Sequence, residues 1–109
     1  MAERSEREAA YFALLRARDE LSALQRYAEH VGDEVRRLRR AEREEAALRD
    51  GVPPRMRRAL RTSDTELADV RSRRLALLED ERMRLPDRIE AAESFVRECE
   101  RHHDVLGGA

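Results

Sequence analysis

The feature that most constrains this chain is a row of small and apolar residues that recur at alternating steps of three and four positions. Such spacing places the whole row on one face of an α-helix, and its persistence over more than three heptads is typical of a coiled-coil seam. Arg, Asp and Glu surround the row, so the helix can bury only this narrow face against a partner helix. The row consists of Leu14, Ala17, Leu21, Leu24, Ala28, Val31, Val35 and Leu38.

Composition also favours thin helical packing over a thick globular core. Of the 109 residues, 43% are charged and only 4% are aromatic, which leaves little bulky material to fill a core. Hydrophobic residues make up 40% of the chain and recur periodically, which argues against disorder. We therefore expect an all-α chain that forms a single helical-hairpin domain over residues 1–109.

The first arm of this hairpin is predicted over about residues 3–49. The segment 50–54 marks its end, because Gly51 suits the left-handed position after a helix and two prolines follow that cannot continue it. A basic turn region is expected over about residues 50–63, with a short helix at 55–61; the alternative is that residues 55–61 form the opening turns of the second helix.

The second arm is predicted over about residues 64–105, followed by a flexible tail at 106–109. Ser63 and Glu66 have the spacing of a capping box, which favours a fresh helix start near Asp64.

Pro86 lies within this second arm, in an apolar row that keeps one helical phase from Leu75 to Leu106. A loop would normally reset the phase, so we expect one long helix that is kinked near Pro86. The alternative is a three-helix arrangement with a break at the proline.

Arms of equal length joined by a short turn predict an antiparallel coiled coil. The predicted register places Phe12 level with Phe95, and Leu14 near Ala91 and Ala92. So narrow a seam buries too little apolar surface to offset the ordering of the backbone, so we expect two hairpins to form a four-helix bundle. The residues expected to widen the apolar stripe for this self-association are Tyr11, Phe12, Leu15, Tyr27, Leu75, Leu77 and Phe95.

The net charge of −1 conceals an uneven distribution. Residues 36–61 hold ten arginines and four acidic residues, whereas both ends of the chain are acidic. Arginine binds carboxylate and phosphate bidentately, so we expect the hairpin tip to contact an acidic protein or nucleic acid; the alternative is a solvated surface neutralised by neighbouring acids. The candidate contact residues are Arg36, Arg40, Arg55, Met56, Arg57, Arg58 and Arg61.

Residues near the C-terminus carry a weak signal for metal binding. Glu100 and His103 have the Glu-x-x-His spacing of carboxylate-bridged di-iron bundles, and Cys99 lies beside them. One chain has only one such unit, and four zinc ligands at standard spacing are absent. We therefore expect no metal, no cofactor and no small-molecule substrate.

The sequence contains no motif that names a reaction, such as a glycine-rich phosphate loop or a recognisable nucleophile turn. The N-terminus lacks the apolar stretch of a signal peptide, and the single cysteine cannot form an internal disulfide, so a cytoplasmic location is expected. The predicted role is a non-catalytic coiled-coil module for assembly or scaffolding. The alternative is a small nucleic-acid-binding regulator that uses the basic tip.

Overall fold

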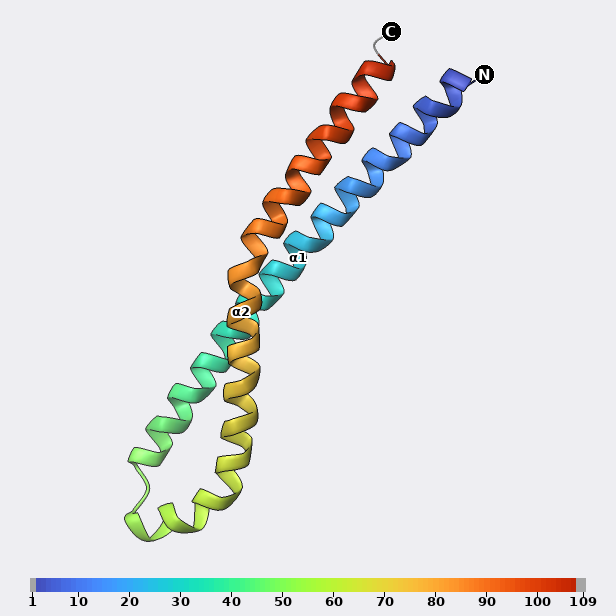
Figure 1. Ribbon diagram of the computed structural model, residues 1–109. Coiled ribbons are helices and arrows are strands. Elements are labelled where there is room, and N and C mark those ends of the chain that lie inside the picture. Colours follow the sequence, from blue (N-terminus) through green and yellow to red (C-terminus); the bar gives the residue numbers. More distant parts are fainter. Residues whose placement is uncertain (1, 108–109) are drawn as a thin grey trace. The chain divides into compact units, whose positions relative to one another are not determined.

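The chain forms two long helices, α1 (Ala2–Asp50) and α2 (Pro54–Gly107), joined by a short turn (Figure 1). The computed structural model describes residues 2–107, without the side chains of 2–4 and 58–64. This arrangement confirms the all-α prediction. Within the described residues, neither helix contains a stretch long and apolar enough to cross a membrane.

The chain divides into two compact units, and each unit pairs one part of α1 with one part of α2. Unit 1 consists of Met1–Glu29 and Arg84–Ala109, and unit 2 consists of His30–Met83. In each unit the two helices run antiparallel, as the hairpin prediction required (Figure 1).

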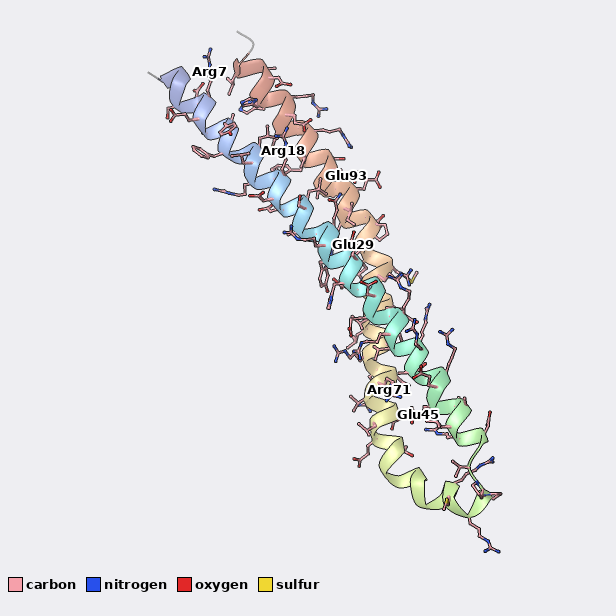
Figure 2. The ribbon with its side chains drawn as sticks, turned by 180° about the vertical axis from the view of Figure 1, so that it is seen from behind. Arg7, Arg18, Glu29, Glu45, Arg71 and Glu93 are labelled. Carbon is pink, nitrogen blue, oxygen red and sulfur yellow. The ribbon has the colours of Figure 1, made fainter. Side chains whose placement is uncertain are left out.

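The core of unit 1 is small. Leu14, Ala17 and Val96 are buried together, and Leu21 and Cys99 pack against them half-buried. The ion pair between Arg18 (labelled in Figure 2) and Glu100 adds little, because the two groups meet at 3.3 Å with both side chains about half exposed. Apolar contact along the seam is therefore the main interaction that holds α1 against α2 in this unit.

The core of unit 2 contains the two most deeply buried side chains, Val31 and Val35, which have no exposed surface. Leu38 and Leu75 are also buried in this unit. The seam predicted from the spacing is therefore the buried face of α1 in both units.

The turn after α1 differs from the expected geometry. The Gly51 N–H donates to the Leu48 carbonyl at 3.2 Å, and the Val52 N–H donates to the Arg49 carbonyl at 3.2 Å. No described residue has a positive φ, so Gly51 does not adopt the predicted left-handed conformation. Successive i to i+3 bonds satisfy the final carbonyls of α1 instead.

The second arm begins earlier than predicted. α2 starts at Pro54, where a fixed φ and a missing N–H are harmless, and the Met56 N–H donates to the Pro53 carbonyl at 3.0 Å. Its backbone is helical through residues 58–64, so the separate short helix and the fresh start near Asp64 are wrong. The helix also continues to Gly107, through the first two residues of the predicted tail; residues 108 and 109 lie outside the described part.

Pro86 lies inside α2 without ending it. The residue before it, Leu85, is only 2% exposed, so packing holds this part of the helix despite the missing N–H. The expectation of one helix through Pro86 is confirmed and the three-helix alternative is wrong, while the kink at the proline stays a prediction.

The predicted register within unit 1 is also wrong. Phe12 was placed level with Phe95, but the ring of its neighbour Tyr11 lies 5.9 Å from the ring of His103, eight residues further along α2. Leu14 packs in the cluster with Val96, rather than near Ala91 and Ala92. The difference arises where the chain reverses direction. Arg49, in the last turn of α1, and Ala68 line one groove between the helices. The residues of α2 before Ala68 therefore precede the part of α2 that pairs with α1, and this shifts the register.

Candidate interaction surfaces

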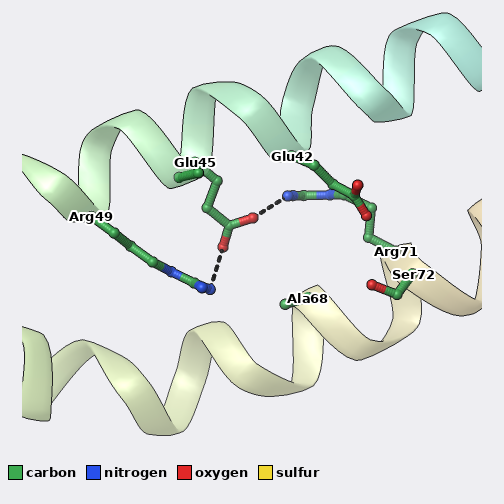
Figure 3. A pocket seen from close by; sticks show the side chains of 7 residues that line it. Glu42, Glu45, Arg49, Ala68, Arg71 and Ser72 are labelled. Atoms are coloured by element: carbon green, nitrogen blue, oxygen red, sulfur yellow. Dashed lines mark hydrogen bonds and ion pairs between the residues drawn. The ribbon is translucent and has the colours of Figure 1, made fainter.

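The seam of α1 changes character after Leu38. Continuing the same alternating steps leads to Glu42, Glu45 and Arg49, so charged residues occupy the seam positions of the last three turns. These side chains line a shallow, solvent-open groove of about 200 Å³ between α1 and α2 in unit 2 (Figure 3). The groove is also lined by Ala46, Ala68, Arg71 and Ser72.

Glu45 links the two helices across this groove. One carboxylate oxygen accepts a hydrogen bond from Arg71 of α2, and the other accepts one from Arg49 of α1 at 3.2 Å (Figures 2 and 3). The side chains of Glu45 and Arg71 are only 24% and 28% exposed. An ion pair that is partly withdrawn from water loses much of its Coulomb attraction to desolvation, so this part of the seam stabilises the pairing less than leucines would.

Large apolar side chains lie on the outside of the same unit. We call this set the unit 2 strip, and its members are between 63% and 72% exposed. A charged seam with apolar flanks reverses the usual pattern of a coiled coil. The unit 2 strip consists of Leu48, Leu67, Val70 and Leu77.

The members of the unit 2 strip lie along one side of the unit. Leu48 follows Glu34 by two heptads on α1, and Leu67 precedes Arg74 by one heptad on α2, so each leucine shares a row with a charged residue. Arg74 Nη2 lies 3.5 Å from Glu34 Oε2, which shows that the two rows are neighbours. The other two strip residues lie within about one helical turn of Arg74.

Glu34 is the centre of a small network on this side. Arg37 donates to its two carboxylate oxygens at 3.0 and 2.8 Å, and Arg74 approaches from α2. The hydrogen bonds from Arg37 lower the pKa of Glu34 below its ordinary value, and the same contact raises the pKa of Arg37. The Glu34 side chain is 17% exposed, whereas Arg37 and Arg74 are 63% and 61% exposed, so the network presents guanidinium groups to solvent.

Unit 1 exposes aromatic side chains that the sequence assigned to self-association. Tyr11, Phe12 and Phe95 are about half exposed, and the rings of Tyr11 and Phe12 lie edge to face at 5.7 Å. Leu15 and Tyr27 are also exposed.

Leu75 was assigned to the same self-association surface, and this assignment requires a correction. Its side chain is buried in unit 2, because it occupies the seam of α2. Leu77, which was assigned to that surface as well, is exposed and belongs to the unit 2 strip.

The residues predicted for the basic tip have different environments. The Arg57 side chain donates to the Val52 carbonyl at 3.0 Å and to the Asp50 carbonyl at 3.5 Å, so it satisfies carbonyls at the end of α1 and in the turn. Arg36 pairs with Asp33. The side chains of Arg58 and Arg61 lie outside the described residues.

Three other residues of the predicted tip are exposed. Arg40 and Arg55 make no ion pair or hydrogen bond with the part of the chain that the structure describes, and Met56 is 61% exposed. The described tip therefore offers fewer uncommitted arginines than the sequence indicated.

The weak metal candidates do not converge. Cys99 packs against the core of unit 1, Glu100 pairs with Arg18, and His103 contacts Tyr11 and lies 3.7 Å from Asp104. Among residues 2–107, apart from the side chains left out above, no group of three or more potential ligands is positioned to hold a metal ion.

No protein family, curated protein or solved structure matches the chain in the comparisons. The class is therefore defined by the fold: the chain is an all-α helical hairpin with a narrow buried apolar seam and exposed apolar side chains in both units.

Sequence reasoning did not identify the groove or the unit 2 strip. The signal was present, because extending the seam beyond Leu38 places Glu45 between the helices. Predicting the unit 2 strip would have required the observed register of the two helices. The assumption of two arms of equal length gave a different register.

Replacing Glu45 and Arg71 together with leucine should extend the apolar seam. We expect the double variant to raise the free energy of unfolding by about 1–3 kcal/mol, because two apolar side chains replace a partly desolvated ion pair. Urea unfolding followed by circular dichroism measures this, at one fixed protein concentration. The matched control, R39L/E79L, alters a more exposed ion pair and should have an effect within about 0.5 kcal/mol. A decrease for E45L/R71L would contradict the account.

Glu34→Gln should reduce stability in a pH-dependent way. The folded pKa of Glu34 lies below its unfolded value, so its carboxylate contributes stability above the unfolded pKa, and the contribution is lost as the pH falls through the folded pKa. We expect the melting temperature of the parent to exceed that of E34Q at pH 6, and the difference to shrink below about pH 4.3. Thermal melts across this range provide the measurement, and a difference that grows on acidification would refute the assignment.

Proposed function

We propose that the chain is a non-catalytic coiled-coil module that self-associates through the exposed apolar residues of unit 1 and offers unit 2 to another macromolecule. Two hairpins would join in a four-helix bundle, with the aromatic side chains of unit 1 at the contact. Assembly or scaffolding is the role that such a module serves.

The observation that carries this proposal is the amount of surface left uncovered. The chain exposes 8885 Å², whereas a compact monomer of the same mass exposes about 6,200 Å². The excess of about 2,600 Å² is comparable to the 1,000–2,500 Å² or so that each protomer of an obligate dimer buries. Within the described residues, twelve large apolar side chains are exposed and nine hydrophobic residues are buried. So many exposed large apolar side chains beside so small a core support a contact with another chain.

The aromatic side chains of unit 1 suit a contact between copies. Tyr and Phe supply large contact areas at a small cost in side-chain entropy, and aromatic residues are enriched at the centres of interfaces. Tyr11 and Leu15 lie four residues apart and share one face of α1, with Phe12 beside them.

Nucleic-acid binding by the basic tip is the second candidate, and the exposed guanidinium groups of Arg40 and Arg55 favour it. Two other tip arginines are engaged elsewhere, since Arg57 bonds carbonyls of the turn and Arg36 pairs with Asp33. Residues 36–61 also contain no aromatic side chain on which bases could stack. Protein association is therefore the better supported function.

Sedimentation equilibrium of the full chain at micromolar concentration tests the proposal. We expect a dimer, and we expect the triple variant Y11Q/F12Q/F95Q to raise the dimer dissociation constant at least 100-fold while circular dichroism stays helical. The matched control is Met83→Gln, which removes an apolar side chain that is 81% exposed in unit 2 and should leave the dimer unchanged. A fully helical monomer for the parent chain, or a triple variant that dimerises as well as the parent, would refute it.

A further inference from the structure

The charged part of the seam holds an ion pair between the helices that weakens their pairing, and the observed register gives that pair a role. We propose that the ion pair between Glu45 and Arg71 selects the observed register of α2 on α1 over a register that is shifted by one heptad, which we call the slipped register. The selection takes place within one chain and does not depend on self-association through unit 1.

The slipped register is the one in which the two arms have equal length. Equal arms would place Tyr11 level with Val96, whereas the Tyr11 ring lies 5.9 Å from the ring of His103, seven residues further along α2. Seven residues are one heptad, so both registers turn the same helical faces toward each other. The slipped register would also bring into contact with α1 the first turns of α2, which precede its paired part. The connection between the helices therefore does not exclude it.

The apolar seam of α1 accepts the slipped register. A shift by one heptad brings Leu24, Ala28 and Val31 to positions that other apolar seam residues occupy in the observed register. The same shift brings Leu38 to the position of Glu45. The helices of unit 2 would therefore keep an apolar seam, and apolar contact alone does not select between the two registers there.

Charge distinguishes the two registers. In the observed register, Glu45 accepts hydrogen bonds from Arg71 across the groove and from Arg49 on its own helix. In the slipped register, Arg71 would lie against Leu38, seven residues before Glu45, and would lose its carboxylate partner. A partly buried guanidinium group without a partner opposes that pairing, in the way that one polar residue at a seam position fixes the register of a coiled coil.

Glu45 and Arg71 are better placed for this role than the more exposed ion pairs that join the helices of unit 2. Their side chains are 24% and 28% exposed, whereas those of Arg39 and Glu79 are 51% and 40% exposed. A further pair contains Arg74, whose side chain is 61% exposed. Water can solvate these exposed arginines in either register, so breaking their ion pairs has a smaller cost.

Disulfide trapping at the native Cys99 measures the register. Cys99 packs against the cluster that contains Leu14, so in the observed register L14C should form a disulfide with it. In the slipped register position 7 takes the place of position 14, so R7C reports the slip. Under the same oxidant we expect the disulfide of L14C to form at least tenfold faster than that of R7C. Denaturing electrophoresis separates disulfides within one chain from those between copies, and only the former are counted.

Arg71→Leu is the variant that should release the register. Leucine at position 71 needs no carboxylate partner and packs against Leu38 in the slipped register, so the R7C disulfide should form at least tenfold faster in R71L than in the parent, and the L14C disulfide more slowly. Arg71→Lys keeps the positive charge and should keep the parent's rates. The matched control R39L/E79L removes a more exposed ion pair and should also keep them.

E45L/R71L provides a second variant, because it removes both charges and should be more stable than the parent. Its R7C disulfide should also form faster than that of the parent, since neither register then breaks this ion pair. Circular dichroism before oxidation confirms that each variant is helical. Equal rates for R7C and L14C in the parent, unchanged rates in the helical leucine variants, or a slip in R39L/E79L as large as in R71L would overturn the inference.

Discussion

The pairing of α1 with α2 depends on an apolar seam that is narrow and that ends before the helices do. Ala10, Leu14 and Ala17 are buried in unit 1, and Val31 and Val35 are fully enclosed in unit 2. After Leu38 the same helical face carries charge, and Glu45 holds α2 through Arg71 rather than through apolar contact. The apolar seam therefore explains why the two helices pair. Its end also explains which part of unit 2 has the weaker pairing.

The exposed surfaces follow from this division. A two-helix arrangement can cover only one stripe on each helix, so every further apolar residue stays in water unless another chain covers it. Unit 1 leaves aromatic side chains exposed, and unit 2 leaves leucines and a valine exposed. The two sets differ in chemistry, because aromatic side chains dominate the first and aliphatic side chains the second.

Helix formation and the buried face could be predicted from the sequence because both depend on local periodicity. Leu14, Ala17, Val31 and Val35 were all placed on the seam by spacing alone, and the continuous phase around Pro86 indicated one helix. The register could not be predicted from arm lengths, because it depends on how much of α2 precedes the part of that helix that pairs with α1. Leu75 was placed both on the seam of the second arm and on the self-association surface, and its burial agrees with the seam alone.

The contacts of individual arginines could not be predicted from the composition. Arg57 lies in the most basic segment, yet it bonds backbone carbonyls near the end of α1, and no spacing rule distinguishes it from Arg55. The charged part of the seam could have been predicted, because the alternating steps of three and four positions continue along α1 to Glu45. Charge at a seam position is the sequence signal that separates the firmly paired part of α1 from the rest.

Hydrogen exchange of the α1 backbone amides tests most directly whether the pairing of α1 with α2 weakens after Leu38, where the apolar seam ends. The account predicts that amides of residues 31–38, beside the buried valines, exchange at least 100-fold more slowly than those of residues 42–50, where charged side chains occupy the seam. Equal protection over the two segments would show that the charged part of the seam holds the helices as firmly as the apolar part, and would contradict the account.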